Sequence, residues 1–236
     1  MFQLKKFLAV AIIFTFLASV APLLLPQDDG LIQLTYTIEA DENYVKPPSD
    51  GGGKPSVDYK IIYRGFTSQV PLNWVVYTKN PDGLTSTVVS DAITAALDEW
   101  QTATTKKLAN PITIAESDAT GIVAKNEEDA IMFGDYPQSG VIAVTYIWIN
   151  RVTKQIVECD IVFDVDFTWG DGAANPALMD LQNIAAHELG HTLNLDDIYD
   201  KAKADLTMYG YSDNGDIEKR SLAPGDIAGI QAIYGP

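Results

Sequence analysis

The chain is poor in residues that bind metals or form cross-links, since its 236 residues include two histidines and one cysteine. A lone cysteine cannot form an internal disulfide, which excludes a small disulfide-stapled domain. Cys159 lies in an apolar run, and this context favours an inert buried thiol over a reactive one. Basic residues are also scarce, with 16 Lys and Arg against 32 Asp and Glu and a net charge of −16. This charge repels phosphates, so we predict no nucleic-acid partner.

The N-terminus carries an export signal. Lys5 and Lys6 precede an almost unbroken apolar run at residues 7–25, within which Ser19, Val20 and Ala21 offer a small-residue cleavage pattern. The run is also near the length that spans a bilayer as a helix, and Pro22 disfavours cleavage after Ala21. We therefore predict that residues 1–26 are a signal peptide or a membrane anchor, and that the protein is secreted or extracellular, with residues 7–25 as its only membrane contact if they are retained.

Residues 27–57 are acidic and then rich in proline and glycine, as in "VKPPSDGGGKPS". They hold few large apolar residues for packing, so we predict a linker. The remaining residues, 58–236, are enough for one domain, and no internal repeat divides them.

Hydrophobic periodicity predicts the elements of this domain. Alternating and β-branched runs indicate strands, spacing of three and four residues indicates helices, and Asn175 with Pro176 is typical of a helix start. Because strands come first and helices are interleaved or late, the fold class is α+β. We predict strands at 59–66, 72–78, 140–149 and 156–167, and helices at 87–105, 175–193 and from 224 onward.

Both histidines lie in "AAHELGHTLNLDD", residues 185–197. On a helix, His187 and His191 share one face one turn apart, so both rings can bind one zinc ion. Glu188 points about a quarter-turn away, where its carboxylate can take a proton from a water that the zinc activates. This arrangement predicts hydrolysis, with Glu188 as general base.

A catalytic zinc site generally needs a third protein ligand, and the chain has no third histidine. We predict Asp197, because Asn194 tolerates the positive φ needed to turn the chain back after the helix. Asp196, Glu218 and Cys159 remain alternatives.

The pattern His187-Glu188-x-x-His191-x-x-Asn194-x-x-Asp197 resembles the metzincin zinc signature, which usually has glycine and histidine in the last two places. Snapalysin-type metzincins have aspartate as the third ligand. "LTMYGY" places Met208 at the family's Met-turn, and "SLAPGDIAGIQAIYG" is similar to the end of matrixins, the matrix metalloprotease family. The resemblance covers residues from about 72 to the end.

The resemblance implies the metzincin zincin fold, a twisted five-stranded mixed sheet with three main helices. It implies a secreted or membrane-tethered zinc endopeptidase, with strand 140–149 as the sheet edge that pairs with an extended protein or peptide substrate. Structural calcium is common in the family, and Asp164, Asp166 and Asp171 could supply oxygens. We expect a monomer. The alternatives are a zinc peptidase of another clan with a remote acidic ligand and a non-catalytic secreted module stabilised by zinc.

The matrixin pattern is not matched everywhere. Gly210 replaces the usual proline after the Met-turn tyrosine, and Tyr211 comes one place early for the tyrosine of the specificity pocket. No cysteine lies between the apolar leader and the domain, so the matrixin mechanism of latency through a thiolate on zinc is absent.

Overall fold

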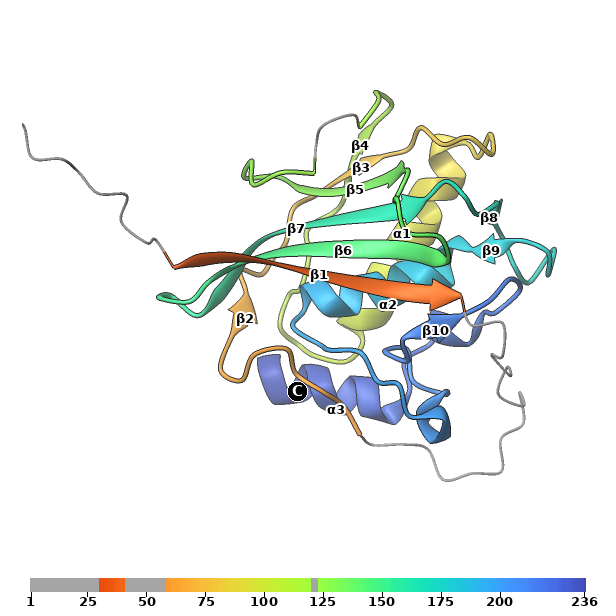
Figure 1. The fold of residues 1–236 in the computed structure, drawn as a ribbon. Helices are drawn as coiled ribbons and strands as arrows, with labels where there is room; N and C mark the ends of the chain where they lie inside the picture. Colours follow the sequence, from red (N-terminus) through yellow and green to blue (C-terminus); the bar gives the residue numbers. More distant parts are fainter. Residues whose placement is uncertain (1–29, 41–57, 120–122) are drawn as a thin grey trace, which may run out of the picture.

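The computed structural model describes residues 30–40, 58–119 and 123–236 (Figure 1). The predicted leader at 1–26 and residues 27–29 and 41–57 of the predicted linker lie outside the described residues, so for these residues both stay predictions. Within the described residues, no helix is both long and apolar enough to cross a bilayer.

Eight strands of the described chain form one mixed sheet, with the order β10-β1-β6-β7-β5-β3-β4 and with β2 paired to β7. Five of them are neighbours and correspond to the predicted five-stranded sheet. The other three, β1, β2 and β10, extend it. The strands are β1 (Leu31–Ala40), β2 (Thr67–Ser68), β3 (Trp74–Tyr77), β4 (Thr113–Ala115), β5 (Asp129–Gly134), β6 (Val141–Asn150), β7 (Gln155–Asp164) and β10 (Tyr211–Ser212).

Strand β1 contradicts two expectations. It lies within the predicted linker, yet it pairs antiparallel with β6 from Leu31↔Asn150 to Glu39↔Val141. Strand β6 is therefore not a free sheet edge, because β1 covers the side on which we expected a substrate (Figure 1). Residues 31–40 form a strand because Ile32, Leu34 and further apolar residues alternate strictly with polar ones, which gives β1 one apolar face to bury.

The described helices match three predictions with shifted ends. They are α1 (Ser86–Gln101), α2 (Leu181–Thr192) and α3 (Pro224–Tyr234), with short 3₁₀ turns η1 (Lys201–Lys203) and η2 (Glu218–Arg220). The predicted start of α2 at Asn175 is wrong. Asp180 caps the helix instead, because its carboxylate accepts a hydrogen bond from the Asn183 N–H, while β9 (Met179–Asp180) pairs with β8 (Trp169–Gly170) just before it.

The main core lies between the sheet and helices α1 and α2, which pack on one of its faces (Figure 1). The predicted hairpin is confirmed as β6 and β7. The strand predicted at 59–66 is wrong, since this segment has only an isolated bridge from Ile61 to Leu195. It runs past the end of α2, where the turn after that helix engages its main chain.

Candidate active site

Helix α2 presents both imidazoles to one point. The Nε2 atoms of His187 and His191 lie 3.2 and 3.6 Å from Oδ1 of Asp197. One ligand atom from each residue lies within 4.8 Å of the other two, so the structure brings together the three side chains predicted as metal ligands. All three residues are buried.

Asp197 reaches the histidines because the chain reverses after α2. Asn194 has a φ of 76°, as predicted, and the Leu195 N–H donates to the carbonyl of Gly190 at 3.0 Å. The Asn194 side chain also holds the segment before β2. Its Oδ1 accepts from the Tyr63 N–H at 3.1 Å, and its Nδ2 donates to the carbonyls of Tyr63 and Phe66 at 2.9 Å each.

The hydrogen bonds of the two rings orient them for a cation. Nδ1 of His187 lies 2.8 Å from the carbonyl of Thr207, and Nδ1 of His191 lies 2.9 Å from that of Leu195. Each Nδ1 therefore carries the proton and leaves Nε2 with its lone pair. Both Nε2 atoms and Oδ1 of Asp197 are buried without a hydrogen-bond partner. Buried polar atoms are rarely left in this way, so the donor set fits zinc.

Electrostatics favour the metal-binding forms of His191 and Asp197. Burial lowers the pKa of His191 to about 4 and so keeps this ring neutral. Burial alone would raise the pKa of Asp197, but the neighbouring imidazoles of His191 and His187 lower it overall. Burial likewise lowers the pKa of His187, but the adjacent carboxylate of Asp197 outweighs this and raises the pKa overall. Metals bind neutral imidazole and ionised carboxylate, which are the forms expected for His191 and Asp197.

Glu188 lies beside the cluster but is not part of it. Its Oε2 accepts a hydrogen bond from the Thr145 hydroxyl of β6, while Oε1 is buried without a hydrogen-bond partner. Burial raises the pKa of Glu188 to about 7. A carboxyl group with this pKa can exchange a proton near neutral pH.

Met208 lies beneath the histidine-bearing helix. A Cβ on Gly190 would lie 2.2 Å from its Sδ, so the helix and the methionine approach closely only because residue 190 is glycine. Asp226 of α3 fixes this segment, since its carboxylate accepts from the backbone N–H groups of Thr207 and Met208 at 2.8 and 3.2 Å. The carbonyl that orients His187 belongs to the same segment.

The family model for matrixins matches residues 66–235. The chain belongs to the matrixin family. Stromelysin-1 of Rattus norvegicus is 38% identical over 78 residues, which are 33% of this chain and 15% of the relative. Interstitial collagenase of Oryctolagus cuniculus is 43% identical over 77 residues (33% and 15%), and matrilysin of Felis catus 38% over 76 residues (32% and 27%). The chain thus spans only a minor part of each relative's length.

Membership of the matrixin family confirms the predicted α+β fold. The geometry also distinguishes Asp197 from the other residues considered as the third metal ligand. Asp196 is half-buried and lies outside the cluster, with its Oδ2 atom 3.8 Å from Nζ of Lys60. Glu218 lies in η2 and is in neither ligand group found among the described residues. Cys159 is buried in β7 with its pKa raised by burial, as expected for an inert core thiol.

Sequence reasoning missed three side chains around the matrixin's cluster. Thr145 holds Glu188, and its signal was a polar residue on the inward face of an apolar strand. Tyr199 donates to Oδ2 of Asp197 at 3.1 Å. Tyr36 of β1 stacks on His191 with ring centroids 4.6 Å apart. Tyr36 lies in the segment we predicted as a linker, so no local signal pointed to this contact.

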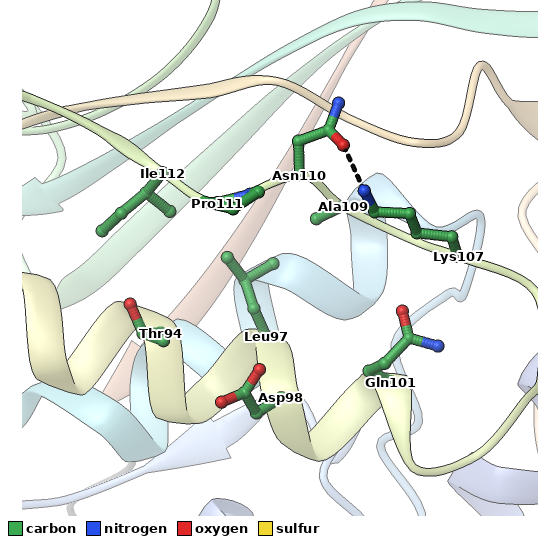
Figure 2. Close-up of a pocket in the computed structure, with 9 residues that line it drawn as sticks. All are labelled: Thr94, Leu97, Asp98, Gln101, Lys107, Ala109, Asn110, Pro111 and Ile112. Atoms are coloured by element: carbon green, nitrogen blue, oxygen red, sulfur yellow. Dashed lines mark hydrogen bonds between the residues drawn. The ribbon is translucent and has the colours of Figure 1, made fainter.

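Two other features lie outside the histidine cluster. Asp135, Asp164 and Asp166 form a second group that could hold a cation, whereas the third acid predicted for calcium, Asp171, pairs with Arg220. A hollow of about 500 Å³ lies between α1 and the segment 107–112, and Figure 2 shows the side chains that line it. None of its lining residues belongs to the histidine cluster, so it is separate from the candidate active site.

Proposed function

We propose that this matrixin is a zinc-dependent endopeptidase in which His187, His191 and Asp197 hold the zinc and Glu188 is the general base. The observation that carries the proposal is the convergence of two Nε2 atoms and one Oδ1 atom without other partners, beside a carboxylate outside the ligand set. A purely structural zinc site usually fills all four positions with protein ligands and has no role for an extra buried acid.

The chain's own residues have distinct roles in this proposal. Zinc, when bound, would polarise the substrate carbonyl and lower the pKa of a water molecule. Thr145 fixes Oε2 of Glu188, which leaves Oε1 to take a proton from the attacking water and to deliver it to the leaving amine. The Thr207 and Leu195 carbonyls keep the proton of each imidazole on Nδ1.

Two variants of the full chain test the proposal. Glu188→Ala should retain stoichiometric zinc and lose hydrolysis of casein by at least about a hundredfold, because it removes the base but no ligand. Asp197→Ala should lose both, because it removes a ligand. Zinc is measured by elemental analysis after dialysis, and Glu218→Ala is the matched control for a remote acidic ligand. If Glu188→Ala cleaves casein as fast as the wild type, Glu188 is not the general base. If neither protein cleaves casein, the non-catalytic zinc module replaces the enzyme.

We also propose that the protein is secreted or membrane-tethered through residues 1–26 and that it acts on protein substrates in extended conformation. The apolar run after Lys5 and Lys6 supports the first part, and the antiparallel pairing of β6 with the extended strand β1 supports the second, because it shows that β6 can pair with an extended chain. Calcium at Asp135, Asp164 and Asp166 is a further proposal. Asp164 supports it, because this residue is buried and its Oδ2 has no hydrogen-bond partner.

A further inference from the structure

Strand β1 is an inner strand of the sheet, placed between β10 and β6. The family match begins at residue 66, so β1 precedes the matrixin domain in sequence and is added to its sheet. Its C-terminal end lies between two elements, antiparallel to β6 and parallel to β10. The Glu39 N–H donates to the carbonyl of Gly210 at 3.3 Å, and the Ala40 N–H donates to that of Gly140 at 2.8 Å. Extended peptides are recognised by such main-chain pairing.

The side chains of β1 alternate between the candidate active site and the outside. Tyr36 is directly opposite Thr145, the residue that holds Glu188, and its ring stacks on His191. Ile38, two residues on and on the same face, is 0% exposed and belongs to the main core. Thr35 faces away and is exposed. The face of β1 that carries Tyr36 and Ile38 thus covers the histidine cluster.

This cover is incompatible with catalysis in the structure as it stands. The Nε2 atoms of both histidines, Oδ1 of Asp197 and Oε1 of Glu188 are all buried. A hydrolase must admit both a substrate carbonyl and a water to such atoms. Since β1 stacks on His191 and takes up the main-chain pairing of β6, a peptide substrate would have to take its place.

We propose that residues 31–40 are an intramolecular occupant of the peptide groove between β6 and β10, and that they keep the active site closed until they are displaced. That the closed site is an active site rests on the proposed function. The groove itself would accept an extended peptide with an aromatic side chain at the place of Tyr36 and a β-branched aliphatic one at the place of Ile38. This mode of closure needs no cysteine.

The test uses the full chain and a fluorescent peptide with the sequence of residues 31–40. Ile38→Asp places a charge on the buried face of β1 and should free the groove, whereas the matched control Thr35→Asp places the same charge on the exposed face. Both are made in the Glu188→Ala background, so that the peptide stays intact. Fluorescence anisotropy should show the peptide binding about ten- to a hundredfold tighter to the Ile38 variant, the effect expected from losing one buried aliphatic side chain.

With Glu188 restored, casein hydrolysis should rise by a similar factor in Ile38→Asp and not in Thr35→Asp. The milder Ile38→Ala should show intermediate effects, and it decides the question if Ile38→Asp does not fold. Peptide binding without hydrolysis would support the groove and refute the enzyme. Hydrolysis that is equal in all variants, with no peptide binding, would refute the closure and support the enzyme. Unfolding of Ile38→Ala would show that β1 is a fixed part of the fold and would overturn the proposal.

Discussion

Asn194 should stabilise the protein in two separable ways. Asparagine tolerates the positive φ at this position, although less well than glycine does, and its side chain makes hydrogen bonds that glycine cannot make. Asn194→Gly keeps the turn but removes the three bonds to Tyr63 and Phe66. At about 1 kcal/mol net for each bond, the loss is about 3 kcal/mol. Asn194→Ala loses the same bonds and adds about 1 to 2 kcal/mol of left-handed strain at a φ of 76°. The expected order of stability is therefore wild type, then Gly, then Ala.

Urea unfolding of the zinc-saturated proteins measures these differences, and thermal unfolding should show roughly 6 to 12 °C lost for Asn194→Gly. Asn194→Asp is the matched control, because its carboxylate can still accept from the Tyr63 N–H but cannot donate to the two carbonyls. It should be less stable than the wild type by about 2 kcal/mol. If Asn194→Gly proves as stable as the wild type, the hydrogen bonds to the 59–66 segment contribute nothing and the reasoning fails.

Three further predictions concern the surroundings of the site. Gly190→Ala should destabilise the fold by about 2 kcal/mol in urea unfolding through clashes with Met208 and Trp100, and Met208→Ala should remove the part due to Met208 in a double-mutant cycle. Asp226→Asn should weaken zinc binding about tenfold in chelator competition, because it loosens the segment that orients His187, with no matching change in Asp226→Glu. Burial raises the pKa of Asp160 to about 8, above its unfolded value, so stability should fall as pH rises from 5 to 8. Asp160→Asn should flatten that decline by about 2 kcal/mol, and an unchanged slope would refute the assignment.

The predictable parts of the structure depend on local physics. Two histidines four residues apart share a helical face whatever surrounds them, and Asn194 tolerates a positive φ in any fold, so the Asp197 cluster followed from the sequence. The hairpin of β6 and β7 followed in the same way from two apolar runs around a short polar turn.

The parts that were missed depend on partners far along the chain. Residues 31–40 alternate strictly, but their surroundings are polar and rich in proline and glycine, and nothing local shows that β6 offers a free edge. Asn175 and Pro176 have good chemistry for a helix start. The helix begins at Leu181, capped by Asp180, because β8 and β9 pair just before it and because Arg220 binds the Asp180 carboxylate. The 59–66 segment has strand propensity but receives its hydrogen bonds from the turn after α2.

The aspartate at the third position gives the site a specific geometry because of its neighbours. Tyr199 binds Oδ2 of Asp197, so only Oδ1 faces the two imidazoles, and the side chain can offer a metal one oxygen. If these three residues hold zinc as proposed, their two nitrogens and one oxygen would leave a four-coordinate ion one position for water or substrate. Tyr36 stacks on His191 from the side of β1, next to these atoms. The proposed displacement of β1 would therefore remove an aromatic ring from His191, one of the proposed zinc ligands, and so links the ligand set to the opening of the site.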